Sequence, residues 1–132
     1  MIPTDLQGRR ILVVEDEVMI ALMLESALTD AGCDVVGPCS SMTEANNAIS
    51  LGNLDAAILD INLRGETSFN LARTLMRHHV PIVVVSGYTP EILPDDVRVV
   101  SFHEKPFQSS AVMCSLVDAI RGQQALETSP AA

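Results

Sequence analysis

The sequence predicts an α/β fold, a doubly wound, five-stranded parallel sheet covered by helices. Five short runs of the chain have an apolar centre of β-branched or aliphatic residues, which is typical of buried strands. The segments between most of these runs repeat apolar residues at helical spacing. At 132 residues the chain is long enough for one hydrophobic core and too short for two. We therefore expect a single domain in which strands and helices alternate.

The five predicted strands share an apolar centre bounded by polar or turn residues. They are assigned to residues 9–14, 34–39, 54–60, 80–85 and 97–102. In the third strand, Ala57-Ile58-Leu59 leads directly to Asp60, which then lies at the carboxyl end of the strand. The fourth is the most strand-like run, and Pro81 lies at its entry, where a missing backbone donor is tolerated. Right-handed crossovers limit these strands to a few topologies.

The predicted helices are the segments in which apolar residues recur on one face. They are assigned to residues 18–31, 41–51, 68–77 and 109–122. Gly32 and Gly122 are stop signals for the first and last helices, and Ser40 or Ser41 is a candidate cap for the second. In the first helix, Met23 and Leu24 are among the residues expected to face the core.

The segment between Gly87 and Arg98 has a weaker pattern. It contains two prolines and leaves no room for a full amphipathic helix, so a fourth helix between the last two strands should be reduced. Residues 123–132 are small and polar, and we expect them to form a disordered tail. The predicted domain therefore spans residues 9–122.

The composition disfavours several classes of protein. The formal net charge is -9, from 17 acidic against 8 basic residues, and such a field disfavours binding to nucleic acid. No apolar segment approaches the roughly 20 residues of a membrane span, and the first ten residues are too polar for a signal peptide, so a cytoplasmic location is expected. Cys33, Cys39 and Cys114 lack the spacing of a metal site, so reduced thiols are expected.

Polar side chains follow four of the predicted strands close to where each strand ends. Glu15 and Asp16 follow the first strand, Asp60 ends the third, Ser86 follows the fourth and Lys105 the fifth. Because the carboxyl ends of parallel strands meet at one edge of a sheet, where such sheets bind ligands, we expect these side chains to converge. Lys105 is also the only lysine in the sequence, which indicates a need for a compact ammonium at this place.

Together these side chains suit phosphoryl transfer to a carboxylate. Asp60 is the candidate nucleophile, which would form an aspartyl phosphate. Mg²⁺ would be held by Asp16 and Asp60, with Glu15 acting through water, since this cation prefers oxygen ligands. Lys105 and Ser86 would bind the remaining phosphoryl oxygens. Taken singly, Asp60 is also explained as a strand-terminating residue, and Asp16 as an acid in the first turn of a helix.

Four motifs closely resemble those of the receiver domains of two-component response regulators. They are Ile-Leu-Val-Val-Glu-Asp-Glu at 11–17, Leu-Asp-Ile-Asn-Leu at 59–63, Val-Val-Ser-Gly at 84–87 and Lys-Pro-Phe at 105–107. With the elements around them they extend over residues 9 to about 122. The resemblance implies a single receiver domain with the flavodoxin-like (CheY-like) topology and the strand order 2-1-3-4-5.

The resemblance also implies a role for each matching position. Asp60 is the phospho-acceptor and Lys105 the phosphate-binding lysine. The implied ligands of Mg²⁺ are Glu15, Asp16, Asp60 and the backbone carbonyl of Asn62. Ser86 becomes the switch hydroxyl and Phe102 the aromatic switch residue. A cis bond between Lys105 and Pro106 is typical of the family.

The function implied by this resemblance is that of a response regulator. The domain would take a phosphoryl group from a histidine kinase or phosphotransfer protein onto Asp60, in a Mg²⁺-dependent reaction. It would then change its affinity for a downstream protein target. It would catalyse only its own phosphorylation and dephosphorylation. A homodimer, and an output domain elsewhere in a longer protein, are left open.

Two segments depart from the commoner receiver pattern. Arg64-Gly65-Glu66 stands where many receivers have a proline, and Ser86-Gly87-Tyr88 replaces the usual Thr-Ala pair. These features resemble the FATGUY subgroup of single-domain receivers, in which the fourth helix is reduced. That likeness implies kinase partners of the HWE or a related class.

Two other functions stay open at this point. A small phosphatase working through an aspartyl-phosphate intermediate would need a second acid as general acid/base and a substrate cap, and neither is obvious. A flavin- or nucleotide-binding module would need a Gly-rich phosphate loop after the first strand, which is missing. It would also need aromatic side chains for stacking, of which the chain has Tyr88, three Phe and no Trp.

Overall fold

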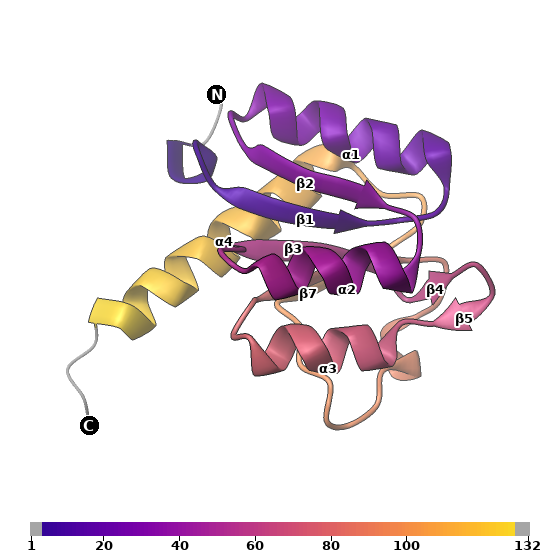
Figure 1. Ribbon diagram of the computed structural model, residues 1–132. Helices are drawn as coiled ribbons and strands as arrows, with labels where there is room; N and C mark the ends of the chain where they lie inside the picture. The colour runs from indigo at the N-terminus through magenta and orange to yellow at the C-terminus, as the bar shows by residue number, and fades with distance from the viewer. Residues whose placement is uncertain (1–3, 129–132) are drawn as a thin grey trace.

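The computed structural model describes residues 4–128, with side chains described from residue 5 to residue 123. It shows a five-stranded parallel sheet between two layers of helices (Figure 1). The strands are β1 (Arg10–Val14), β2 (Asp34–Cys39), β3 (Ala56–Asp60), β6 (Ile82–Ser86) and β7 (Ser101–Glu104). Their order is β2-β1-β3-β6-β7, which is the predicted order 2-1-3-4-5 when these strands are counted along the chain. The predicted fold class is confirmed.

Helices cover both faces of this sheet. They are α1 (Val18–Asp30), α2 (Met42–Leu51), α3 (Phe69–Arg77) and α4 (Ser109–Thr128). Helices α1 and α4 pack on one face, and α2 and α3 pack on the other (Figure 1). Within the described part of the chain, no helix combines the length and the apolar character needed to cross a bilayer.

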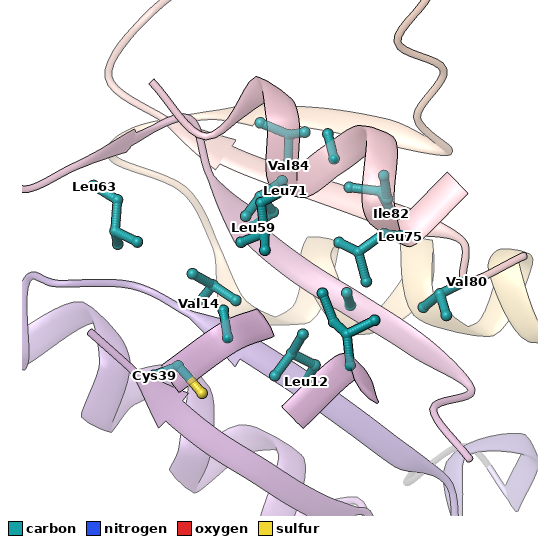
Figure 2. Packing of buried hydrophobic residues seen from close by; sticks show 14 of the residues in the cluster. Leu12, Val14, Cys39, Leu59, Leu63, Leu71, Leu75, Val80, Ile82 and Val84 are labelled. Carbon is teal, nitrogen blue, oxygen red and sulfur yellow. The ribbon is translucent and has the colours of Figure 1, made fainter. Parts of the chain in front are cut away.

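Side chains of the central strands alternate between two buried clusters. Leu12 and Leu59 belong to the cluster beneath α2 and α3, part of which Figure 2 shows. Val13 and Ile58 point to the opposite cluster, beneath α1 and α4. Burying each such side chain stabilises the fold by about 1.5–3 kcal/mol. Because both faces of the sheet are covered, the central strands are apolar at consecutive positions between their ends, as their sequence pattern indicates.

The strands end together at one edge of the sheet. The aligned pairs near this edge are Val14 with Leu59, Asp60 with Val85, and Ser86 with Glu104. The residues that end or follow β1, β3, β6 and β7 are therefore neighbours in space. This is the arrangement that places a ligand site at the carboxyl edge of a parallel sheet.

The last strand, β7, begins later than predicted. The prediction places it at residues 97–102, whereas it runs from Ser101 to Glu104. Val97 is buried in the cluster beneath α2 and α3 without belonging to a strand. The start of this apolar run therefore fills the core instead of joining the sheet, and a short apolar run does not distinguish these two uses.

Helix α4 continues past Gly122 to Thr128. The prediction that this helix ends at Gly122 is therefore wrong, and residues 123–128, predicted as part of a disordered tail, are helical. A glycine inside a helix costs only about 1 kcal/mol relative to alanine, and the Gln, Ala, Leu and Glu residues that follow favour the helix. Residues 129–132 of the predicted tail lie outside the described residues.

The segment between β6 and β7 contains one short helical element, the 3₁₀ turn η2 (Pro90–Ile92). The predicted reduction of the fourth helix is thus confirmed. Arg73 of α3 holds this segment through two hydrogen bonds to the carboxylate of Asp96, at 2.7 and 3.1 Å. The segment is therefore tied to α3 by an ion pair at its surface.

The chain after Asp60 makes a small hairpin. Strands β4 (Asn62–Leu63) and β5 (Glu66–Thr67) pair in antiparallel fashion. The two residues between them have positive φ angles, 53° at Arg64 and 84° at Gly65. Two-residue hairpin turns favour such angles, which glycine adopts without strain. The hairpin follows Asp60 directly and so lies beside the edge described above.

Candidate functional site

An open pocket lies at the carboxyl edge of the sheet. Its lining residues are Asp16, Glu17, Asp60, Asn62, Gly87, Tyr88 and Lys105. They come from the segments that follow β1, β3, β6 and β7, together with the last residue of β3. Topology alone therefore brings acids and the single lysine to one place.

Asp60 is held rigidly at the end of β3. It is 3% exposed, and its Oδ1 accepts a hydrogen bond from the backbone amide of Asn62 at 3.1 Å. Its Oδ2 lies 3.0 Å from Nζ of Lys105. The hydroxyl of Ser68 donates to the backbone carbonyl of Asp60 at 2.6 Å. The carboxylate is thus fixed with one oxygen facing an ammonium.

Glu15 is buried beside it. The backbone amide of Glu15 bonds to the carbonyl of Cys39, which extends the β1–β2 pairing and carries the side chain inward. Its Oε2 accepts from the amide of Glu17 at 3.2 Å, and its Oε1 lies 2.9 Å from Nζ of Lys105. Burial, followed by a hydrogen bond shared with Asp60, raises the pKa of Glu15 to about 8. Two buried acids in one pocket therefore resist being ionised together.

Lys105 is the counter-ion of this acidic group. Its backbone amide donates to the carbonyl of Ser86 at 2.7 Å, which fixes the segment after β7 against the end of β6. Burial lowers the pKa of Lys105, but hydrogen bonds to Glu17, Glu15 and Asp60 outweigh this effect and raise it overall. The lysine therefore stays charged. Its bond to Pro106 is cis, as the resemblance implies.

Asp16 lies at the rim of the pocket, half-exposed. Its Oδ2 accepts a hydrogen bond from the backbone amide of Arg64 at 2.9 Å, so the β4–β5 hairpin is attached to it. Asn62, at the start of the hairpin, accepts through its Oδ1 from the amide of Gly65 at 3.0 Å. The turn that carries Arg64 and Gly65 thus orients the acid that the sequence predicts as a metal ligand.

The three acids fit a hard divalent cation. One oxygen atom from each of Glu15, Asp16 and Asp60 lies within 4.8 Å of the others. Oε1 of Glu15 is buried and has no hydrogen bond of good geometry, despite its short distance to Lys105, so it retains an unused lone pair. Carboxylate oxygens are the ligands that Mg²⁺ prefers. The donor set and its orphaned oxygen therefore suit Mg²⁺.

The two predicted switch residues lie beside the pocket instead of lining it. Ser86 is fully buried at the end of β6, and its Oγ accepts a hydrogen bond from the amide of Tyr88 at 3.0 Å. Phe102 lies on β7 next to Val84 and packs, half-buried, against the cluster beneath α2 and α3. The two side chains therefore occupy neighbouring strands.

Three pocket residues, Glu17, Gly87 and Tyr88, were not predicted as site residues. Glu17 contacts Lys105 at 2.7 Å, and Tyr88 lines the pocket next to Gly87. The signal for Glu17 was available, since three consecutive acids precede α1 and the chain has one lysine to neutralise them. Tyr88 carried no such signal, because an aromatic residue after a strand has no characteristic spacing.

Comparison with known families identifies the kind of domain. A family model of the response regulator receiver domain matches residues 11–118. The chain belongs to this family. The matched range contains every site residue predicted from the sequence, from Glu15 to Lys105.

Individual receivers show the same likeness. The phyllosphere-induced regulator PhyR of Methylorubrum extorquens is 30% identical over 118 residues, which are 86% of this chain and 44% of PhyR. The solution structure of SdrG from Sphingomonas melonis Fr1 has 35% identity and a TM-score of 0.73, covering 86% of this chain and 97% of SdrG. The PhyR receiver domain of Erythrobacter litoralis has 26% identity and a TM-score of 0.78, covering 96% and 97%. The chain spans about half the length of the curated relatives it matches, or less.

Proposed function

We propose that this receiver takes a phosphoryl group from a histidine kinase or phosphotransfer protein onto Asp60 and then changes its affinity for a downstream protein. The observation that carries the proposal is the position of the Asp60 carboxylate. It is buried at the end of β3, faces Lys105 at 3.0 Å and lies in reach of two further acids. A nucleophile, a cation for the phosphoryl oxygens and a metal-binding acid pair are thus assembled in one pocket.

The reaction is a displacement at phosphorus. An oxygen of Asp60 forms the new O–P bond while the P–N bond of the donor phosphohistidine breaks, and the departing imidazole takes up a proton. The ammonium of Lys105 meets the negative charge of the phosphoryl oxygens. Mg²⁺, when bound, would supply further positive charge between nucleophile and phosphoryl group.

The residues that would hold Mg²⁺ are those whose oxygens already gather at the pocket. Glu15, Asp16 and Asp60 supply carboxylates, and the backbone carbonyl of Asn62 is the fourth proposed ligand. The hairpin amide on Asp16 leaves its other oxygen available. Because burial raises the pKa of Glu15, an added positive charge would favour its ionised form.

The switch would use Ser86 and Phe102. The Ser86 hydroxyl accepts a hydrogen bond from the amide of Tyr88 and keeps its own proton to donate. A phosphoryl group on Asp60 offers new acceptor oxygens one strand away. We expect the hydroxyl to turn towards them and the β6–η2 segment, together with Phe102, to shift with it.

Helix α1 offers a surface for the phosphodonor. Val18, Met19, Leu22 and Met23 are exposed large apolar side chains on its first half, which begins directly after the pocket residue Glu17. Met23 is 38% exposed, so the prediction that it faces the core is wrong. A donor must bring its phosphohistidine to Asp60 and therefore covers this rim. We propose that the histidine-bearing protein, a kinase of the HWE or a related class, docks here.

The decisive test is intact mass with and without acetyl phosphate and Mg²⁺. We expect a single phosphoryl adduct on the wild-type chain and none on Asp60→Asn, which keeps the size of the side chain but removes the nucleophile. The proposal is falsified if Asp60→Asn takes up phosphoryl as well as the wild type. Multiple turnover on a small phosphate ester would point instead to the small phosphatase considered from the sequence.

A further inference from the structure

The ammonium of Lys105 faces three carboxylates. Its Nζ donates hydrogen bonds to Oε1 of Glu17 at 2.7 Å and to Oδ2 of Asp60 at 3.0 Å, and it lies 2.9 Å from Oε1 of Glu15. An ammonium has three protons. Two of these protons are therefore donated to Glu17 and Asp60 before any phosphoryl oxygen arrives, and Glu15 lies at ion-pair distance, so an incoming oxygen meets an ammonium that already has partners.

The three carboxylates differ in how easily they can leave. The side chains of Glu15 and Asp60 are 0% and 4% exposed, whereas that of Glu17 is 59% exposed. Separating Lys105 from a buried carboxylate would leave a charge without a partner away from water, which is costly. Releasing Glu17 returns its carboxylate to solvent. Glu17 is therefore the partner that an incoming oxygen displaces most easily.

The position of Glu17 in the chain does not otherwise explain its orientation. It is the N-cap residue of α1, a position where shorter side chains such as Asp or Ser accept a hydrogen bond from the first helical turn. Its side chain makes no such capping bond and reaches across to Lys105, 88 residues further along the chain. The carboxylate is thus bonded to the pocket and not to its own helix.

We propose that Glu17 competes with the phosphoryl group for Lys105 and so slows the phosphorylation of Asp60. This inference rests on the proposed function of the pocket. As a phosphoryl oxygen reaches Lys105, one hydrogen bond of the ammonium is exchanged for another, and no covalent bond of Glu17 changes. The displaced carboxylate stays at the pocket rim, where its charge repels an anionic phosphodonor. Glu17 is a positioning residue that acts through Lys105.

The first test compares variants of Glu17 in the full chain with acetyl phosphate and Mg²⁺. Glu17→Gln keeps the size of the side chain and removes its charge. We expect Asp60 to be phosphorylated about fivefold faster, as suits the loss of a strong but exposed ion pair. Glu17→Asp, which keeps the charge on a shorter stem, should give an intermediate rate. Glu25→Gln removes the same charge about two turns further along α1 and should leave the rate unchanged.

The second test measures the contact itself. Because Lys105 is the only lysine, its ¹⁵N-labelled Nζ gives one lysine resonance. Without ligand, Glu17→Gln should shift this resonance and Glu25→Gln should not. With Mg²⁺ and beryllofluoride, a tetrahedral mimic of the phosphoryl group, wild type and Glu17→Gln should give the same resonance, since Glu17 has then left Lys105. Beryllofluoride should also bind about fivefold more tightly to Glu17→Gln.

The outcomes separate this inference from the proposed function. Slower phosphorylation or weaker beryllofluoride binding in Glu17→Gln would show that Glu17 supports the bound state, and an unchanged rate would show that it has no influence. Either result overturns the competition while wild-type phosphorylation of Asp60 stands. A wild-type chain that takes up neither phosphoryl nor beryllofluoride overturns the proposed function, and this inference with it.

Discussion

Lys105 and the acids around it depend on one another. Without the ammonium, Glu15 and Asp60 would be two buried carboxylates with no positively charged side chain beside them among the described residues. Only a bound cation could then neutralise them. Without the acids, burial would favour a neutral lysine. The pocket is therefore built from charges that are stable only together, which is common where a structure is arranged for reaction instead of stability.

Replacing Lys105 should strongly slow the phosphorylation of Asp60. In Lys105→Met the phosphoryl oxygens lose their protein cation, and we expect phosphorylation by acetyl phosphate to be about a hundredfold slower, as for the loss of one preorganised electrostatic group. Rates of adduct formation by intact mass measure this. Arg121→Met removes an exposed cation paired with Asp5 at 2.9 Å and is the matched control. Equal rates in both variants would contradict the assigned role of Lys105.

At the scale of elements, the prediction succeeded where a local pattern decides the structure. Strand ends at Asp60 and Ser86 follow from apolar runs that are buried on both faces, and the reduction of the helix between β6 and β7 to the turn η2 follows from the prolines of that segment. Helix α4 shows the opposite case. Gly122 is a correct stop signal in isolation, but the helix formers on either side outweigh it.

This conclusion about α4 can be tested with one substitution. A Cβ at Gly122 would meet no atom of the described residues within 4 Å, and the φ of Gly122 is not positive, so Gly122→Ala should stabilise the fold by about 0.5–1 kcal/mol. The midpoint of urea unfolding measures the change. Gly32→Ala is the contrasting variant, because Gly32 has a φ of 83° and its added carbon would lie 3.3 Å from Gln7. We expect that variant to be less stable than wild type, and a destabilised Gly122→Ala would argue against a continuous helix.

At the scale of the whole molecule, Glu15 makes folding depend on pH near neutrality. Burial, followed by its hydrogen bond with Asp60, raises its pKa from 4.5 to about 8. Between these values the folded chain keeps a proton at Glu15 that the unfolded chain has released. The stabilising effect of that proton is complete below about pH 4.5 and is lost as the pH rises from there to about 8. Over this range the free energy of unfolding falls by up to about 1.4 kcal/mol per pH unit.

Urea unfolding in EDTA from pH 6.5 to pH 8 measures this effect. Burial lowers the pKa of His103 from 6.5, so this histidine titrates below the chosen range. The urea concentration at the unfolding midpoint of the wild type should fall as the pH rises. In Glu15→Gln, which cannot ionise at this position, the midpoint should depend less on pH. Mg²⁺ should stabilise the wild type more at pH 8 than at pH 6.5, because the proton on Glu15 competes with the cation. A wild-type midpoint that rises with pH would contradict the raised pKa.

The sequence by itself determined the parallel sheet, its covering helices and the set of residues at its carboxyl edge. These depend on apolar runs and on which residue follows each run, and both are local properties of the chain. Only the tertiary structure decided that Glu17 shares Lys105, that the hairpin holds Asp16, and that Val97 fills the core instead of joining β7. Such contacts join segments up to 88 residues apart. They follow from distances between packed elements, and no pattern along the chain encodes a distance of that kind.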